Sequence, residues 1–235
     1  MNRPLIIAID GPAGSGKTTT ARLLAQRLGY TYIDTGAMYR ALTLAALDYG
    51  VPITDDALAA LLERISIELR HTPAGQRTYL DGRDVTERIR SADVTALVSQ
   101  VSSFPSVRRS MIRLQRELGR NGGVVMDGRD IGTAVFPDAD VKIFMTADLK
   151  TRAVRRLEEL RAADPTLTVD DVVEQLDQRD AFDSSRQYNP LRRADDAIVV
   201  DTTNLTVEEQ VERILGIIRD RTGTLSNDPS YERHY

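Results

Sequence analysis

Residues 11–18 read Gly11-Pro12-Ala13-Gly14-Ser15-Gly16-Lys17-Thr18, which fits the phosphate-loop pattern G-x-x-x-x-G-K-[ST] at every fixed position. The apolar run Leu-Ile-Ile-Ala-Ile at 5–9 predicts a strand before the loop, and apolar residues at helical spacing over 21–28 predict a helix after it. In that setting the glycines let successive backbone N–H groups surround a polyphosphate at the positive end of a helix. The segment predicts a nucleoside triphosphate site, with Lys17 at the β- and γ-phosphates and Thr18 as a ligand of Mg²⁺; a glycine-rich turn without a ligand is the alternative.

The alternation of strand and helix continues along the chain. Apolar runs at 30–33, 124–126, 141–145 and 197–200 have the composition of buried parallel strands. Apolar residues recur with helical period over 107–118 and 207–218. These elements predict an α/β fold: a five-stranded parallel sheet flanked by helices, with right-handed crossovers.

Three segments depart from this alternation. Residues 53–91 hold two alternating runs about a Thr-Pro-Ala-Gly turn and predict a small antiparallel insertion. Residues 161–193 are rich in Asp and Arg and predict an irregular, mobile lid segment. Residues 222–235 are expected to form a flexible tail. The predicted core then comprises 1–52, 92–150 and 194–221, with the insertion at 53–91 and a lid helix and lid segment at 151–193.

Composition and charge exclude several function classes. The chain has no Cys, which excludes disulfides and thiolate catalysis, and its two His residues do not suffice for a His-based metal site or triad. The net charge of −4 argues against nonspecific binding to nucleic acid or to an acidic membrane. Residues 5–9 are too short for a membrane span or a signal-peptide core. We therefore expect a cytoplasmic protein.

A second binding site is predicted beside the phosphate loop. Thr35 follows the strand at 30–33 and begins a helix, so an anion could bind there, with Arg40 about one turn later. Asp127 follows the strand at 124–126, where it could hold a metal-bound water near Thr18. Arg129 and Asp130 point toward the same crevice. The alternatives are a helix cap with a solvated Arg40, and a surface turn with an Arg–Asp pair.

Further candidates lie on predicted helices and on the lid. Ser99 and Arg108 are expected at the start of one long helix, although a plain capped helix would look the same. Three arginines follow the fourth strand at helical spacing and share a predicted face, unless they pair with surface acids: Arg152, Arg155 and Arg156. An Arg-rich lid supplies charge to a transferring phosphoryl group and excludes water.

The phosphate loop does not specify the reaction. GTPases add a guanine-reading N-K-x-D segment, which this sequence lacks, and large ATPase motors usually have longer domains. A small kinase fold remains, and its second substrate must be identified from other residues.

Taken in order, five motifs resemble those of the bacterial cytidylate kinase family, a group of P-loop nucleoside monophosphate kinases. They are the phosphate loop, D-T-G-A-M-Y-R (34–40), S-Q-V-S-S-F-P-S-V-R (99–108), D-G-R-D-I-G-T-A-V-F-P-D-A-D-V-K-I-F (127–144) and R-D-x-x-D-S-S-R (179–186). The likeness extends from about residue 5 to 219, and residues 53–91 resemble the enlarged monophosphate-binding insert of that family.

The resemblance implies transfer of the γ-phosphoryl of ATP to CMP or dCMP with Mg²⁺, by a protein that we expect to be a monomer. It implies that the ATP-binding run extends to Thr19, with Arg155 near the ATP base. It implies that the cytosine is read by Ser99, Arg108 and Asp130. It implies that the CMP phosphate lies among Thr35, Arg40, Arg129 and Arg186, and that the sugar meets Arg179 and Asp183. Catalytic charge would come from Lys17, Arg129 and Arg186, with Arg152 and Arg156 as lid partners.

The chemistry of the base agrees with these roles. Cytosine offers an amine donor beside an unprotonated ring nitrogen, so an Asp acceptor with Arg and Ser donors is complementary, whereas uracil reverses both signs. Two alternatives remain: a P-loop kinase of another small molecule, such as shikimate, gluconate or a different nucleotide, or a non-catalytic nucleotide-sensing module.

Overall fold

A five-stranded parallel sheet forms the centre of the computed structural model, which describes residues 3–73, 75–161 and 164–223. Its strands lie in the order β2-β6-β1-β7-β8, and every neighbouring pair is parallel. Their bounds are β1 (Ile6–Asp10), β2 (Thr31–Asp34), β6 (Val124–Gly128), β7 (Val141–Thr146) and β8 (Ile198–Asp201). The predicted α/β fold and its five parallel strands are confirmed.

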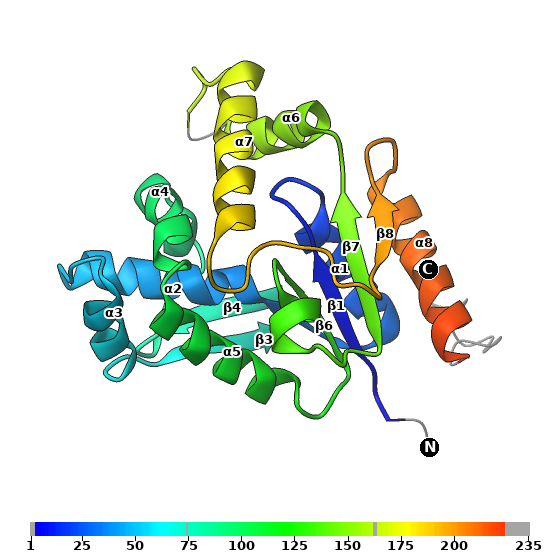
Figure 1. The fold of residues 1–235 in the computed structure, drawn as a ribbon, viewed down its shortest axis with the longest axis horizontal. Coiled ribbons are helices and arrows are strands. Elements are labelled where there is room, and N and C mark those ends of the chain that lie inside the picture. The colour runs from blue at the N-terminus through cyan, green and yellow to red at the C-terminus, as the bar shows by residue number, and fades with distance from the viewer. Residues whose placement is uncertain (1–2, 74, 162–163, 224–235) are drawn as a thin grey trace.

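Helices cover both faces of this sheet. Alternation along β1 sends Ile7 and Ile9 toward α1 (Lys17–Leu28) and α8 (Val207–Thr222), while Ile6 and Ala8 pack on the opposite face with the helical turn η2 (Ile131–Val135). The remaining helices are α2 (Thr35–Asp48), α3 (Asp55–Leu62), α4 (Ala92–Val101), α5 (Pro105–Gly119), α6 (Leu149–Leu160) and α7 (Val169–Ser185). In Figure 1, α6 and α7 lie beyond the carboxyl ends of β1 and β7, where ligands bind in open α/β sheets.

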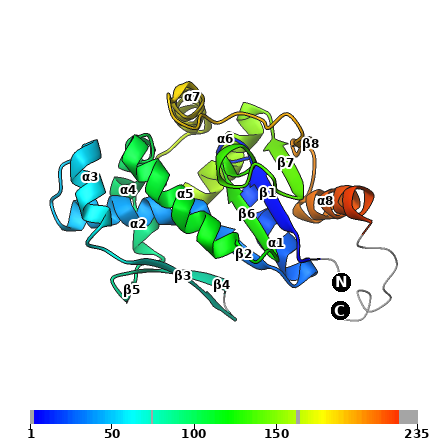
Figure 2. The same ribbon diagram turned by 60° about the horizontal axis from the view of Figure 1, so that its bottom comes forward.

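The predicted antiparallel insertion is present. It consists of β3 (Ile67–Thr72), β4 (Gly75–Leu80) and β5 (Arg83–Asp84), followed by the short helical turn η1 (Arg88–Arg90). Leu80 of β4 is fully buried in the core that α2, α4 and α5 share. Figure 2 shows these strands as a layer separate from the main sheet. Ala74 in the predicted turn lies outside the described residues.

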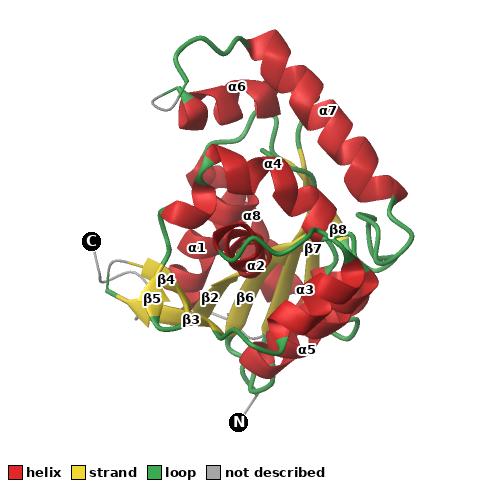
Figure 3. Cartoon of the chain, turned by 90° about the vertical axis from the view of Figure 1, so that its left-hand side faces the viewer, coloured by secondary structure: helices red, strands yellow, loops and turns green. Residues whose placement is uncertain are grey.

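The prediction of an irregular segment over 161–193 is wrong for α7, a helix of 17 residues. A capping box starts it, because Thr168 accepts from the N–H of Asp171 and the Asp171 carboxylate accepts from the N–H of Thr168. Val172 and Leu176 then pack on α6 and on Ala13 of the phosphate loop. Figures 1 and 3 show α6 and α7 packed together at the end of the sheet. The helix needs only a narrow apolar stripe, which its many acidic residues obscure in the sequence.

The long helix expected from Ser99 to Arg108 is also wrong. Ser99 lies in the last turn of α4, the chain then leaves the helix, and Arg108 lies in the first turns of α5. Pro105 begins α5, a position where its missing N–H costs no hydrogen bond. Because of this break, the carboxyl end of α4 and the amino end of α5 lie close together, and Ser99, Ser102 and Arg108 line the same cleft.

The chain ends with α8, and Gly223 caps it in the left-handed region with φ 60°. The tail predicted for 222–235 lies, from residue 224 on, outside the described residues. Over the part of the chain that the structure describes, no helix is long and apolar enough to cross a membrane.

Candidate active site

The phosphate loop has the conformation that its sequence predicts. Gly14 and Gly16 have φ of 76° and 88°, and a Cβ on Gly11 would lie 2.0 Å from the carbonyl oxygen of Met145. Gly16 is the N-cap of α1 and offers no side-chain cap. The first N–H groups of α1 are therefore left for an anion.

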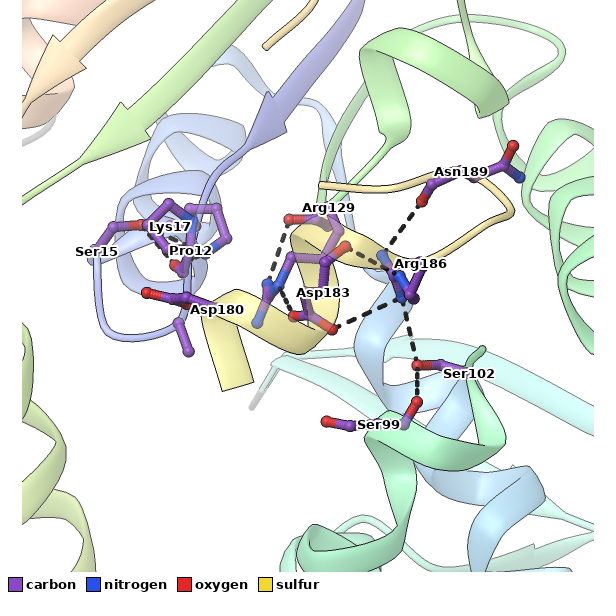
Figure 4. A network of polar contacts seen from close by, with 12 residues as sticks. Pro12, Ser15, Lys17, Ser99, Ser102, Arg129, Asp180, Asp183, Arg186 and Asn189 are labelled. Atoms are coloured by element: carbon purple, nitrogen blue, oxygen red, sulfur yellow. Dashed lines mark hydrogen bonds and ion pairs between the residues drawn. The ribbon is translucent and has the colours of Figure 1, made fainter. Parts of the chain in front are cut away.

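Lys17 lies buried across this loop. Its Nζ donates to the carbonyl oxygen of Pro12 at 2.5 Å and to Oγ of Ser15 at 3.3 Å (Figure 4). Burial, and then the charge of Arg129, lower the pKa of Lys17 well below its usual range. A buried ammonium with only neutral oxygens as direct partners fits an anionic ligand that would complete its coordination.

A carboxylate and a hydroxyl meet at the mouth of the loop. Oγ1 of Thr18 donates to Oδ2 of Asp127 at 2.9 Å, and the hydroxyl of Tyr32 donates to Oδ1 of Asp127 at 2.8 Å. Burial, and then the nearby Asp34, raise the pKa of Asp127 to about 6. Among the described residues no cluster of three or more His, Cys, Asp or Glu could hold a metal unaided. Two hard oxygen donors fit Mg²⁺, which keeps several waters and takes further ligands from phosphates.

Arginines gather across the cleft from the loop. Burial, and then Arg90, lower the pKa of Arg40 to about 10, and burial, and then Arg129, lower that of Arg179 to about 9. Nε of Arg179 is buried without a hydrogen-bond partner. Crowding cations in a buried place is unfavourable unless an anion joins them, so this part of the cleft is suited to phosphate.

A second network ties α7 to the base of the cleft, as Figure 4 shows. Asp183 lies between Arg129, whose Nε donates to it at 2.9 Å, and Arg186, which is 3.7 Å away. Burial acts to raise the pKa of Asp183, but these cations outweigh it and lower the pKa. Arg186 also reaches Oγ of Ser102 at 3.5 Å and the carbonyl oxygen of Asn189 at 3.2 Å. The end of α7 and the residue after it thus contact Arg129, which follows β6, and Ser102 at the end of α4.

The far end of the cleft contains a buried ion pair. Arg108 and Asp130 are 2% and 4% exposed and bond directly to each other. Nη1 of Arg108 donates to the carbonyl oxygen of Ser102, and its guanidinium lies 5.4 Å from the ring centre of Tyr39. The guanidinium of Arg108 and the carboxylate of Asp130 thus lie side by side. Together they can offer hydrogen-bond donors and an acceptor to the polar edge of one ligand.

One cleft of about 510 Å³ joins these parts. Most residues that the sequence predicts for the site line it: Ala13, Gly14, Gly16, Lys17, Thr18, Thr19, Thr35, Arg40, Ser99, Arg108, Asp127, Arg129, Asp130, Arg156, Arg179, Asp183 and Arg186. Gly11, Pro12 and Ser15 belong to the loop behind that surface, and Arg152 and Arg155 do not line it either.

The three arginines of α6 do not act as one group. Arg152 donates to the carbonyl oxygens of Ala13 and Ala147 and pairs with Asp180 at 2.5 Å. Arg155 donates to the carbonyl and hydroxyl oxygens of Thr202 at 2.7 and 3.1 Å. Arg156 alone lines the cleft, where it pairs with Glu159 as the surface-acid alternative predicts.

Sequence reasoning missed several residues of the site. The residues that line the cleft without having been predicted include Asp34, Tyr39, Arg90 and Ser102. Tyr39 and Asp34 stand inside the quoted 34–40 motif, so their position next to Thr35 and Arg40 was a usable signal. Tyr32 had none, because only the pairing of β2 with β6 brings it to Asp127.

Known proteins resemble this chain over nearly its whole length. The profile of the family described as cytidylate kinase matches residues 7–220. The cytidylate kinase of Bacillus pumilus is 52% identical over 216 residues, 92% of this chain and 96% of the relative. Those of Geobacillus thermodenitrificans and Bacillus subtilis are 52% and 47% identical over 95% and 94% of this chain and all of each relative.

Among solved structures, an uncharacterised protein from Eubacterium ventriosum covers 92% of this chain with a TM-score of 0.52 and 14% identity, and 99% of that protein is covered; this supports the fold alone. With a matching profile over nearly its whole length and relatives at about half identity, the chain belongs to the cytidylate kinase family.

Proposed function

We propose that this protein transfers the γ-phosphoryl group of ATP to CMP and dCMP, giving ADP and CDP or dCDP, with Mg²⁺. The observation that carries the proposal is a single cleft that joins a phosphate loop, a cluster of buried arginines and the Arg108–Asp130 pair. Each part suits one portion of the two nucleotides: a triphosphate, a monophosphate and a base with a donor beside an acceptor.

At the donor end, the N–H groups of residues 11–19 would bind the phosphates of ATP, and Arg155 would lie near its base. Lys17 would follow the charge that moves between the β- and γ-phosphates. Thr18 would hold Mg²⁺, with Asp127 acting through a bound water; when bound, the ion neutralises phosphate charge. These residues are already preorganised by the bonds of Thr18 and Tyr32 to Asp127.

At the acceptor end, Arg40, Arg129 and Arg186 would surround the CMP phosphate, together with Thr35. The Thr35 hydroxyl is engaged with the carbonyl oxygen of Asp127 at 2.7 Å, so Thr35 would contribute its backbone N–H. Arg179 and Asp183 would meet the sugar. Arg129 and Arg186 would neutralise charge on the transferring group, with Arg152 and Arg156 as lid partners, because positioning and charge stabilisation supply most of the catalysis.

The base would be read by Asp130, Arg108 and Ser99. Asp130 would accept from the exocyclic amine of cytosine, while Arg108 and Ser99 donate to its acceptors. Arg108 and Asp130 would have to move apart to admit the base. Each side chain would then replace its bond to the other with a bond to cytosine. Uracil offers the reverse pattern and would be rejected.

The proposal includes a monomeric protein acting in the cytoplasm, and a division into a core, an insertion at 53–91 and a lid at 151–193. The insertion packs on α2, and the α6–α7 pair packs on the phosphate loop through Ala13. Arg90 of the insertion lines the cleft, as do Arg156 of α6 and Arg179 and Asp183 of α7. In this proposal the insertion borders the acceptor end, and the α6–α7 pair reaches both ends.

A coupled ADP-release assay tests the function. Purified protein is given ATP and Mg²⁺ with CMP, dCMP, UMP, AMP, GMP, shikimate or gluconate in turn. We expect rapid ADP release with CMP and dCMP and rates at least tenfold lower with the others. A higher rate with shikimate, gluconate or another nucleotide would assign a different kinase, and ATP binding without any acceptor-dependent release would indicate a nucleotide sensor.

A further inference from the structure

Asp10 is a buried carboxylate to which the proposed reaction gives no role. It is the last residue of β1, directly before Gly11 of the phosphate loop, and it is 5% exposed. No Lys or Arg among the described residues forms a salt bridge with it. A buried carboxylate without a paired cation is costly and calls for an explanation.

Both oxygens of Asp10 accept hydrogen bonds from one short stretch of backbone. Oδ1 accepts from the N–H of Ile131 at 2.8 Å, and Oδ2 accepts from the N–H of Gly132 at 2.7 Å. These residues directly follow Asp130 and begin the helical turn η2. Burial nevertheless raises the pKa of Asp10 to about 7, so the two bonds only partly offset its desolvation.

Gly132 lies against both Asp10 and Lys142. A Cβ there would be in ordinary van der Waals contact with Oδ2 of Asp10 at 3.4 Å and would crowd Cδ of the Lys142 side chain at 3.2 Å. Asp130 is 4% exposed and bonds to Arg108, which leaves its carboxylate little freedom of its own. Arg108 thus holds its side chain, and the backbone that Asp10 holds begins at the next residue.

We propose that Asp10 is a positioning residue that fixes Asp130 relative to the phosphate loop and thereby sets the choice between cytosine and uracil. The inference rests on the proposed function, in which Asp130 reads the base. It assigns base selection to a residue on the triphosphate side of the cleft. Strand β1 then serves both substrates. Its carboxyl end leads into the phosphate loop that would bind ATP, and its last side chain, Asp10, holds the backbone next to Asp130, which would bind the base of CMP.

Asp10→Asn tests the proposal because it removes one acceptor and leaves an NH₂ group facing a backbone N–H. Asp140→Asn is the matched control. Asp140 also accepts from a backbone N–H of β1, that of Ile6 at 2.8 Å, but at the opposite end of the strand. The measurements are kcat/KM for CMP and for UMP, KM for ATP, and a melting curve for each protein.

We expect Asp10→Asn to lower kcat/KM for CMP roughly tenfold and to reduce the CMP-to-UMP ratio by a similar factor, with KM for ATP changed less than about threefold. Asp140→Asn should leave the ratio unchanged. An equal fall for CMP and UMP in Asp10→Asn would show a merely structural role, and a rise confined to KM for ATP would show that Asp10 serves only the phosphate loop; either result overturns the proposal.

Asp10→Ala decides the matter if Asp10→Asn does not fold. It removes both acceptors without placing an NH₂ group against the backbone N–H groups of Ile131 and Gly132, and it should lower the CMP-to-UMP ratio in the same direction. A folded Asp10→Ala protein with the wild-type ratio would refute the proposal. Failure of the proposed function is visible separately, since wild-type protein would then show no preference for CMP at all.

Discussion

Thr18 donates a hydrogen bond from its hydroxyl to Oδ2 of Asp127 over 2.9 Å, although 109 positions separate them in the chain. Tyr32 holds the other oxygen of the same carboxylate at 2.8 Å. Parallel pairing of β2 with β6, which sets Tyr32 beside Val125, brings Tyr32 to Asp127. Pairing of β1 with β6 brings the phosphate loop, and with it Thr18, to the same carboxylate. The carboxylate is therefore oriented before any ligand arrives, which lowers the cost of binding.

Asp127→Asn and Tyr32→Phe should both weaken the response to Mg²⁺. We expect the Mg²⁺ concentration for half-maximal rate to rise by about tenfold or more in Asp127→Asn and by a smaller factor in Tyr32→Phe. Tyr30→Phe is the control, because the Tyr30 hydroxyl accepts from the N–H of Leu5 at 3.2 Å and bonds to no carboxylate among the described residues. Initial rates and Mn²⁺ binding in the presence of ADP measure the effect; identical metal dependence in all four proteins would remove Asp127 from the metal site.

Lys17→Ala should lower kcat by about 100-fold or more while the protein stays folded. Burial of the ammonium lowers the pKa of Lys17, so its removal relieves a cost and the melting temperature should not fall. Lys150→Ala, an exposed lysine on α6, is the control. Steady-state rates and circular dichroism melts test both variants. Wild-type turnover in folded Lys17→Ala would show that the loop is not the triphosphate site of the reaction.

Asp130→Asn should narrow the preference for CMP over UMP, because an amide can turn either its donor or its acceptor toward the base. Asp130→Asn should also lower the free energy of unfolding by about 3 kcal/mol, because it leaves the buried Arg108 guanidinium without its counter-charge. This loss was not expected from the sequence, which placed Asp130 in a ligand crevice. Values of kcat/KM for both substrates and urea unfolding measure these effects, and an unchanged ratio would mean that Asp130 does not read the base.

Arg179→Met should raise the stability of the ligand-free protein. Burial and the neighbouring Arg129 lower the pKa of Arg179 to about 9, so the folded protein disfavours its charge. We expect a gain of about 1 kcal/mol, a few degrees in melting temperature, with a large rise in KM for CMP. Arg192→Met, exposed beyond α7, is the control. A lower melting temperature in Arg179→Met alone would show that Arg179 is satisfied without an anion.

Asp10 should make the free energy of unfolding depend on pH. Its pKa is about 7 in the folded protein against 3.8 ordinarily, with Lys17 and Asp130 as the charged groups facing it. Folding favours the protonated form, so the stability it contributes is fully present below about pH 4 and is lost as the pH rises through 7.

The difference in free energy of unfolding between wild type and Asp10→Asn isolates this residue, because the asparagine does not titrate. It should fall by about 1.4 kcal/mol for each unit of the pKa shift as the pH rises from 4 to 8. Urea unfolding at a series of pH values provides the data. A constant difference over that range would show that Asp10 titrates normally.

Local patterns were enough to predict the phosphate loop and the five strands, because both are written in consecutive residues. The placement of Asp127 near Thr18 was also predictable, because both follow predicted parallel strands at the same edge of the sheet. Other partners across the chain were not. Helical spacing put Arg152, Arg155 and Arg156 on one face, yet each contacts a different element. Asp10 gave no signal, because its partner Ile131 lies 121 positions away and is reached only through the order of the strands.

That strand order has a consequence for synthesis. β1 lies between β6 and β7, and β2 pairs with β6, so both early strands depend on residues from 124 to 146. A chain emerging amino end first exposes the apolar side chains of β1 while their neighbours are still in the ribosome. Pairing over such sequence distances is slow and leaves time for aggregation. Nascent chains that stop before residue 124 should therefore depend on chaperones. The phosphate loop, although it is synthesised early, should be among the last segments to reach its folded conformation.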